Sequence, residues 1–299
     1  MRFKILIVIF LIITINQTRA QNDGAGNTGL AFLKLGVGAR SIAMGEAFSS
    51  YTDDASAIIY NPARLLYGEK NNVMLMHNSA AQDFTNDFIG AKISYDKFAL
   101  GFGIFKSGVD NIEIRLQPGA ALGKFNSQNL SINLGAAYKI NDFVSVGFTA
   151  KFLYEKIYVD EASGMGFDFG TNYTKDNTSF SFVLSNLGSI NELKSVSTKL
   201  PTAIRFGGSY LFPTKNFNFG ISVDGFKVLD GGVFHVNAGG EASYKNLVFI
   251  RLGYQTKYDN KGFAAGLGFK YKGLTVDYAI IPYVNNFGTG NTFSLGMTF

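Results

Sequence analysis

Residues 292–299 read TFSLGMTF, so apolar residues alternate with small or polar ones. In an extended strand, Phe293 and its alternate neighbours would lie on one face, and Ser294 and its alternate neighbours on the other. A helix would need a period near 3.6 residues, which this stretch does not have. The runs 130–139 and 262–271 repeat the two-residue period. These three runs predict β-strands with one apolar face.

The same pattern fills residues 70–299 and predicts about fourteen strands in one domain. Their expected ranges are 71–79, 86–95, 97–106, 128–139, 142–155, 163–175, 177–187, 200–212, 216–226, 233–244, 246–256, 261–271, 273–283 and 289–299. Tight turns are expected at 95–97, 140–142, 175–177, 244–246 and 271–273, and long links at 107–127 and 188–199. Short turns at one end and longer loops at the other are typical of outer-membrane barrels. The predicted fold is all-β: a transmembrane antiparallel β-barrel of about 14 strands.

A membrane barrel fits the composition better than a soluble barrel does. The chain contains 29 Phe and 15 Tyr, and only 16% of its residues are charged. The bulky face could not fill the wide lumen of such a barrel in a soluble protein, because barrel diameter grows with strand number. Turned outward, this face would form the lipid-facing band, with Tyr at strand ends in the interfacial girdle. A soluble β-sandwich or propeller is the alternative.

Residues 1–20 have the features of a signal peptide. Arg2 and Lys4 form a basic region, residues 5–15 an apolar region, and residues 18–20 a small-residue cleavage site. The apolar run is short for a membrane span, which needs about 20 residues, and a retained anchor is the alternative. The mature chain would begin near residue 21 and be exported, which predicts a location in the cell outer membrane.

Residues 36–66, GVGARSIAMGEAFSSYTDDASAIIYNPARLL, break the strand pattern. We expect residues 21–69 to form a compact hatch inside the lumen of a barrel that spans residues 70–299. Arg40 or Arg64 would tie this hatch to carboxylates of the wall. The residues expected to shape or anchor the hatch are Gly38, Arg40, Gly45, Asp53, Asp54, Asn61, Pro62 and Arg64.

A short helix is expected inside the hatch, over residues 55–59. Asp53 and Asp54 precede it and would accept hydrogen bonds from its free N–H groups as an N-cap. Asn61-Pro62 would end it, because the residue before a proline avoids helical geometry. The hatch glycines would allow tight turns in a confined space.

The sequence argues against an enzyme, a cofactor or a metal site. It contains no Cys, which excludes disulfides, Cys-ligated metals and thiol catalysis. His77 and His235 are too few for a dedicated zinc site. Residues 36–38, Gly-Val-Gly, lack the third glycine and the βαβ context of a nucleotide loop. Asp53 and Asp54 could be read as paired catalytic carboxylates, but the capping role explains them better. The net charge of +5 is spread along the chain, so no nucleic-acid partner is expected.

Several charged residues on the small-residue face of the strands are expected to point into the lumen. They are Lys92, Lys151, Asp168, Arg205, Asp224, Glu241, Arg251, Lys270 and Asp277. Both signs are present, so no ion preference follows. We favour a network of ion pairs that holds the hatch, and a path for polar solutes is the alternative.

Phe299 has an expected role outside the folded barrel. The machinery that inserts bacterial outer-membrane barrels tends to recognise a last strand that ends on an aromatic residue. Phe299 resembles such a barrel-assembly signal, although an ordinary lipid-facing Phe is the alternative. The barrel-insertion machinery and the outer-membrane lipid are therefore expected partners.

The hatch sequence resembles the N-terminal signature of the PorV/PorQ family. The matching pieces are GARSIAMGEAF at 38–48, DDASA at 53–57 and NPA at 61–63. Shorter pieces follow in the family's order along the barrel: FDFG at 167–170, NLG at 186–188, LPT at 200–202, RLGY at 251–254, DYA at 277–279 and GNTFSLG at 290–296.

That family consists of outer-membrane barrels related to the long-chain fatty acid transporter FadL. The resemblance implies a FadL-like barrel of fourteen strands with a lumenal hatch. It also implies a non-enzymatic role in type IX protein secretion or cell-surface attachment, with other secretion-system proteins or secreted cargo as partners. The alternative is FadL-like transport of hydrophobic compounds such as long-chain fatty acids.

Overall fold

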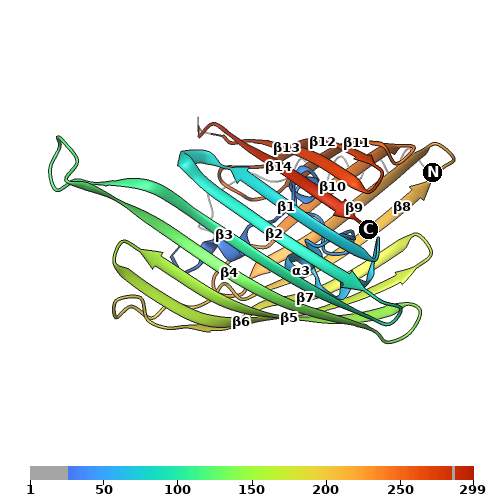
Figure 1. Cartoon of the computed structure of the whole chain (residues 1–299), viewed down its shortest axis with the longest axis horizontal. Coiled ribbons are helices and arrows are strands. Elements are labelled where there is room, and N and C mark those ends of the chain that lie inside the picture. The colour runs from blue at the N-terminus through green and yellow to red at the C-terminus, as the bar shows by residue number, and fades with distance from the viewer. Residues whose placement is uncertain (1–25, 285–286) are drawn as a thin grey trace.

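The computed structural model describes residues 26–284 and 287–299, so the expected signal peptide lies outside the described residues. The described residues form fourteen antiparallel strands that close on themselves, with β1 beside both β2 and β14 (Figure 1). The strands are β1 (Asn71–Ser79), β2 (Phe84–Ser94), β3 (Phe98–Ile114), β4 (Gly123–Lys139), β5 (Val144–Ile157), β6 (Asp160–Lys175), β7 (Thr178–Ile190), β8 (Ala203–Pro213), β9 (Phe217–Val228), β10 (His235–Tyr244), β11 (Val248–Gln255), β12 (Phe263–Tyr271), β13 (Leu274–Pro282) and β14 (Thr289–Thr298). The predicted transmembrane β-barrel is therefore confirmed.

The outward face of the wall is apolar and aromatic. Along β1, Val73 and Leu75 point outward, while Met74 and Met76 point into the lumen. Phe293 of β14 continues the outward band. Tyrosines at strand ends are exposed: Tyr95, Tyr138, Tyr244, Tyr254 and Tyr271. Because a closed barrel pairs the backbone groups of each strand with its neighbours, this face can meet lipid.

The links between strands differ at the two ends of the barrel. At one end, which we call the short-turn end, consecutive strands are joined by two to four residues. At the other, the long-loop end, the links range from two residues to the twelve of 191–202. The alternation of short and longer links agrees with the sequence prediction, although some long-loop links are also tight.

The prediction of a long loop at 107–127 is wrong. β3 and β4 continue as a hairpin, and only residues 115–122 connect them. The hairpin projects beyond the rest of the barrel at the left of Figure 1. A bulge between Val109 and Ile112 shifts the register and interrupts the alternation by which strands are recognised.

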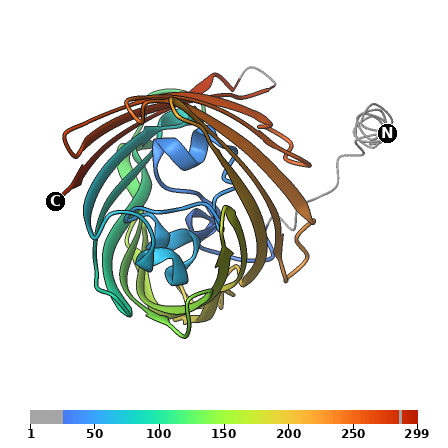
Figure 2. The same ribbon diagram turned by 90° about the vertical axis from the view of Figure 1, so that its right-hand side faces the viewer.

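The segment before β1 lies inside the barrel as a hatch (Figure 2). Its elements are η1 (Ala31–Lys34), α2 (Ala39–Ala43), α3 (Ala57–Tyr60) and η2 (Pro62–Leu66), while η3 (Ala81–Asp83) joins β1 to β2. α2 packs against β11 to β14, and η2 packs against β2 to β6, so the hatch touches opposite parts of the wall. Gly38 and Gly45 adopt φ values of 92° and 64°, which suit glycine in tight turns. None of the helices in the described residues is long and apolar enough to cross a membrane.

The helix expected at 55–59 forms as α3 and ends before Asn61. The predicted capping by Asp53 and Asp54 is wrong, because the N-cap residue is Ser56 and no side chain caps it. Asp54 instead accepts hydrogen bonds from the backbone N and the Oγ of Ser56, at 2.8 and 2.5 Å, in the turn before the helix. Asp53 turns its carboxylate the other way, toward an ion pair described below.

Asn61 and Pro62 fix the hatch to the wall. Asn61 is buried, its Nδ2 donates to the carbonyl oxygen of Thr171 at 3.1 Å, and its Oδ1 accepts from the N–H of Ala63 at 3.1 Å. Pro62 begins η2 and lies against Gly147, where a Cβ would come within 2.3 Å of the Pro62 carbonyl carbon. Glycine at this wall position is what lets the hatch approach so closely.

Candidate functional site

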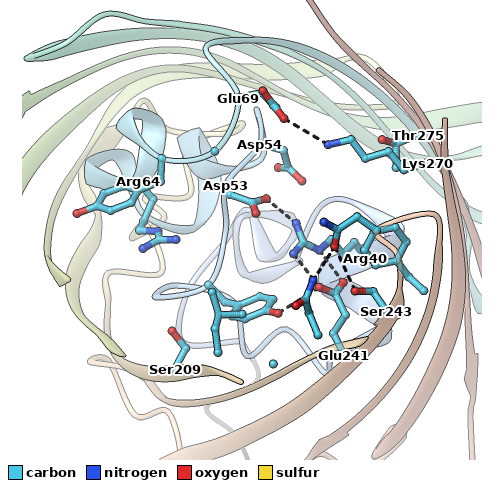
Figure 3. Close-up of a pocket in the computed structure, with 18 of the residues that line it drawn as sticks. Arg40, Asp53, Asp54, Arg64, Glu69, Ser209, Glu241, Ser243, Lys270 and Thr275 are labelled. Carbon is cyan, nitrogen blue, oxygen red and sulfur yellow. Dashed lines mark hydrogen bonds and ion pairs between the residues drawn. The ribbon is translucent and has the colours of Figure 1, made fainter. Parts of the chain in front are cut away.

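The hatch divides the lumen into two compartments of different chemistry. On the short-turn side lies a cavity of about 690 Å³, which we call the vestibule. Figure 3 shows Arg40 and Glu241 on one side of this cavity and Arg64 on the other. On the long-loop side, the hatch meets a cluster of apolar side chains, with the buried Lys151 and the partly buried Arg205 beside it.

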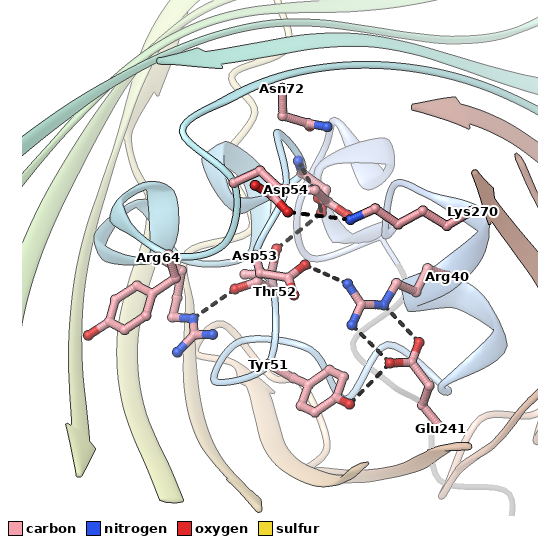
Figure 4. Close-up of polar contacts among 12 residues, drawn as sticks. Arg40, Tyr51, Thr52, Asp53, Asp54, Arg64, Asn72, Glu241 and Lys270 are labelled. Atoms are coloured by element: carbon pink, nitrogen blue, oxygen red, sulfur yellow. Dashed lines mark hydrogen bonds and ion pairs between the residues drawn. The ribbon is translucent and has the colours of Figure 1, made fainter. Parts of the chain in front are cut away.

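Arg40 of α2 joins the hatch to the wall (Figure 4). Its Nε donates to Oε2 of Glu241 at 2.9 Å, and its Nη2 donates to Oε1 at 3.0 Å. Its Nη1 donates to Oδ1 of Asp53 at 2.5 Å, and the hydroxyl of Tyr51 donates to Glu241 Oε1 at 3.1 Å. Burial lowers the pKa of Arg40, but the charges of Asp53 and Glu241 outweigh it and hold that pKa well above its ordinary value. The expected tie between Arg40 and a wall carboxylate is present.

The ion pairs continue from Glu241 along the wall. Arg251 donates from Nε to Glu241 Oε2 at 2.6 Å and from Nη1 to Asp277 Oδ1 at 2.6 Å. Nζ of Lys270 lies 3.7 Å from Oε1 of Glu69, at the end of the hatch. This side of the vestibule is thus lined by ion pairs.

The other predicted lumen charges also face inward. Nζ of Lys151 lies 2.6 Å from Oδ2 of Asp168, and Nη1 of Arg205 lies 3.3 Å from Oδ2 of Asp224. Lys92 donates to backbone carbonyl oxygens of the hatch. All the charged residues expected in the lumen therefore lie on that face, and they are arranged as partners of one another or of the hatch.

Arg64 does not reach a wall carboxylate. The alternative prediction, that Arg64 ties the hatch to the wall through a carboxylate, is therefore wrong. Its Nε donates to the carbonyl oxygen of Thr52 at 2.8 Å, and its Nη1 donates to Oγ of Ser179 at 3.4 Å. Its guanidinium lies over the ring of Tyr67, 4.0 Å from the centroid. The reason is the direction of η2, which turns Arg64 toward a wall that presents hydroxyls, such as that of Ser209.

Apolar side chains of the hatch and the wall pack together on the long-loop side. We call this group the apolar cluster, and its members are Leu30, Phe32, Leu33, Leu35, Met76, Phe88, Phe105, Leu153, Ile190 and Leu200. The ring of Phe32 lies 5.5 Å from that of Phe105, which lies 6.4 Å from that of Phe88. Leu30 and Phe32 are each only 2% exposed. Leu30 adopts the left-handed conformation, with φ 45° and ψ 49°.

The apolar cluster was not predicted, because small and polar residues were expected to face the lumen throughout. Phe88 and Leu153 point inward, while their apolar neighbours Ile89 and Phe152 point outward. The adjacent residues 104–105, Ile-Phe, form another such pair. Two consecutive apolar residues within an alternating strand were the available signal.

Beside the apolar cluster, β7 extends past the start of β8. Their backbone pairing ends at Ser185 and Ala203, although β7 continues beyond that point. Residues 191–202 cover the interval. Asn186 holds this cover in place, because its Nδ2 donates to the carbonyl oxygen of Pro201 at 3.1 Å.

The histidines lie far from the vestibule chemistry. His77 points outward on β1, where its Nδ1 lies 2.7 Å from Oδ1 of Asp87. His235 is buried at the start of β10, with its ring stacked on Tyr258. Within residues 26–284 and 287–299, no group of three or more His, Asp or Glu side chains is arranged to hold a metal ion.

No protein-family model matches the chain, and no curated protein matches its sequence. The fold is similar to that of CymD, a monoaromatic hydrocarbon channel, with a TM-score of 0.64 and 13% identity over 91% of this chain and 99% of that one. It is also similar to the toluene transporter TodX of Pseudomonas putida, with a TM-score of 0.66 and 14% identity over 88% of this chain and 99% of that one. At these identities the likeness shows the shared barrel fold, and it does not point to the PorV/PorQ family in particular.

Proposed function

We propose that the chain is an outer-membrane channel that admits small hydrophobic molecules. The observation that carries this proposal is the apolar cluster, because the interior of an outer-membrane barrel is ordinarily polar. Leu30 and Phe32 of the hatch fill the space that an apolar guest would occupy. The structural likeness to CymD and TodX supports this transport function better than a function in type IX secretion.

The docked N-terminal segment and an apolar guest would compete for the same apolar contacts. Burying a side chain such as that of Phe32 contributes roughly 1.5–3 kcal/mol. The left-handed backbone of Leu30 costs about 1–2 kcal/mol, which offsets part of the gain from burying Phe32, Leu30 and their neighbours. A guest such as toluene would restore the apolar contacts of Phe105 once the segment moves away. Residues 30–35 therefore act as a plug that packing holds in place.

The part of β7 that extends past the start of β8, where only residues 191–202 cover it, would give guests a route from lipid to the apolar cluster. Leu200 belongs both to the cover over this interval and to the apolar cluster. The N–H of Gly29 donates to the carbonyl oxygen of Lys199 at 3.0 Å, so the plug and the cover are joined. Movement of residues 199–202 would therefore release the plug and open the wall together.

Gly29 and Thr198 allow a direct test of this movement. A Cβ placed on Gly29 lies 3.3 Å from the Cβ of Thr198, close to the spacing of about 3.5–4.5 Å in a disulfide. Because the chain has no Cys, the double variant Gly29→Cys/Thr198→Cys can form only that intramolecular bond. In cells that lack the native gene, we expect the oxidised double variant to take up little labelled toluene. A reductant should restore uptake to the wild-type rate.

Each single-cysteine variant is a matched control and should transport like the wild type under both conditions. Uptake of a long-chain fatty acid is measured in the same cells. The proposal fails if the wild-type gene increases uptake of neither compound. It also fails if uptake continues after gel analysis shows that the bond has formed.

A second candidate is a PorV/PorQ-type component of type IX secretion or surface attachment. The ordered motifs favour it, and the projecting β3–β4 hairpin offers a rim for docking, with Leu116 and Leu122 83% and 69% exposed. Affinity capture from detergent-solubilised envelopes tests this function. Recovery of secreted cargo or attachment subunits would support it, and recovery of neither would count against it.

A further inference from the structure

The vestibule contains a buried cation that is not used to anchor the hatch to a wall carboxylate. Arg64 is 6% exposed, and no carboxylate of the described residues lies within ion-pair distance of its guanidinium. Its Nε bonds to Thr52, its Nη1 makes a long contact with Ser179, and its Nη2 has no acceptor in the described part of the chain. Burial lowers the pKa of Arg64 to about 10, while Tyr67 and Asp53 act in the opposite direction, so the group is cationic at neutral pH.

Hydroxyl groups surround this cation, whereas the opposite side of the vestibule carries the ion pairs. The hydroxyl-bearing residues on this side are Ser50, Thr174, Ser179 and Ser209. Figure 3 shows Ser209 on the side away from Arg40 and Glu241.

We propose that Arg64 and these hydroxyls bind the carboxylate of a small organic monocarboxylate that enters the vestibule from the short-turn end. The guanidinium fork can donate two parallel N–H groups to a carboxylate. The hydroxyl of Ser209 already donates to the carbonyl oxygen of Ser50 at 3.0 Å. Those of Thr174 and Ser179 share one hydrogen bond at 2.8 Å, so one member of that pair keeps a proton for the ligand. The vestibule volume of about 690 Å³ leaves room for an organic body, which Leu211 and Phe249 would contact.

The charge of the vestibule disfavours multiply charged anions more than a monocarboxylate. Four basic and six acidic side chains line it, so a multiply charged anion such as phosphate would be repelled. The acidic groups nevertheless leave Arg64 available. Asp53, whose charge acts on Arg64, is paired with Arg40, and Glu241 and Asp277 share Arg251.

This site lies across the hatch from the apolar cluster, so the inference goes beyond the proposed transport of hydrophobic molecules. Binding can be measured on the purified full-length protein in a nonionic detergent, with no transport step. Failure of toluene uptake would therefore leave this inference standing, and failure of binding would leave the transport proposal standing.

Fluorine NMR with 4-fluorobenzoate is the test. The wild type should bind this probe saturably, and Arg64→Gln should bind it about tenfold more weakly, because charge-assisted hydrogen bonds are lost. Arg64→Lys should bind with intermediate affinity, since it keeps the charge and loses the fork. The neutral analogue 4-fluorobenzamide should bind the wild type about tenfold more weakly than 4-fluorobenzoate does.

Ser179→Glu shows whether weaker binding comes from loss of the free Arg64 guanidinium or from displacement of the hatch. The new carboxylate would lie beside Arg64, pair with it and abolish 4-fluorobenzoate binding while the fold is kept. Lys270→Gln is the matched control, because it removes a vestibule cation on the opposite side, and its affinity should equal that of the wild type. The proposal is overturned if the wild type shows no saturable binding, if 4-fluorobenzamide binds equally well, or if Ser179→Glu binds like the wild type.

Discussion

Arg40 and Glu241 meet through two parallel hydrogen bonds, although they are 201 positions apart in the sequence. A planar guanidinium matches a planar carboxylate in this geometry, which a lysine could not reproduce. Arg251 holds Glu241 from the wall, so the contact fixes α2 against β10. Removal of one member would leave the other charge buried without its partner, which is costly. The position of the hatch therefore depends strongly on this pair.

Arg40→Ala should loosen the hatch. It leaves Asp53 without its ion-pair partner and Glu241 with only Arg251 and Tyr51, and breaking a buried pair of this kind costs up to about 3–5 kcal/mol. We expect higher conductance in planar lipid bilayers than the wild type shows. Arg115→Ala is the control, because its pair with Glu113 is exposed on the β3–β4 hairpin, and its conductance should be unchanged. Equal conductance of Arg40→Ala and the wild type would contradict the anchoring role.

The pair between Glu46 of the hatch and Lys261 should make stability depend on pH. Nζ of Lys261 lies 2.9 Å from Oε1 of Glu46. Burial raises the pKa of Glu46, but the charge and hydrogen bond of Lys261 outweigh it, so that pKa lies below its ordinary value. A lowered carboxylate pKa contributes stability above the unfolded pKa of about 4.3, and this stability is lost as the pH falls through the folded pKa.

Glu46→Gln should therefore unfold at a lower temperature than the wild type at pH 7, and the difference should shrink in the acid range. The expected cost at pH 7 is about 2 kcal/mol, the value of a hydrogen bond to a charged group. The temperature at which the heat-modifiable gel shift occurs, determined at several pH values, measures this difference. Glu113→Gln, which removes an exposed charge, should show no such trend. A difference that stays constant from neutral to strongly acid pH would rule out this linkage.

Gly239 and Gly240 are adjacent on β10 and provide a matched pair. A Cβ on Gly239 would lie 2.3 Å from the carbonyl oxygen of Met44 in the hatch, whereas one on Gly240 meets nothing nearer than 3.8 Å. Gly239→Ala should therefore push the hatch from the wall, at a cost of roughly 1–3 kcal/mol for overpacking. Gly240→Ala should behave like the wild type. Protease sensitivity of the hatch reports the difference, and identical digestion of both variants would show that the close contact is unimportant.

Strand alternation was enough to predict the barrel, because lipid outside and small residues inside impose a two-residue period on each strand. Phe293 and its neighbours in β14 show this directly. The extension of β3 and β4 was missed because the hairpin projects past the barrel, where no lipid enforces an apolar face. There, exposed residues such as Leu116 follow no readable pattern.

The site was only partly predictable. Charges such as Arg251 could be assigned to the lumen, because lipid excludes charged side chains. Their partners could not be identified from the sequence, because the path of the hatch decides which groups each side chain meets. Arg40 meets a carboxylate, whereas Arg64 meets hydroxyls. Phe32 lies in a segment without strand or helix periodicity, so nothing local revealed that it fills the apolar cluster.

Phe299 should matter for assembly more than for the folded barrel. Its side chain is 71% exposed, so it contributes little packing. Phe299→Ser should reduce the amount of barrel in the outer membrane, while protein refolded in detergent should melt like the wild type. Phe293→Ser is the control, because it removes an outward Phe that is 57% exposed on the same strand. Equal loss from the membrane in both variants would remove the special role of the last residue.

Phe32→Ala should open the plug. Removing a buried Phe costs about 3–5 kcal/mol. A change of about 5.5 kcal/mol would turn a 99:1 ratio of closed to open plug into 1:99, so this loss should open the plug in a large share of molecules. We expect faster hydrogen exchange over residues 30–35 and faster toluene uptake than in the wild type. Phe206→Ala is the matched control, because it removes the same ring from the outward face, where Phe206 is 50% exposed. Unchanged exchange over residues 30–35 would show that the Phe32 ring does not hold the segment in place, and the plug would then have to be sought elsewhere in the hatch.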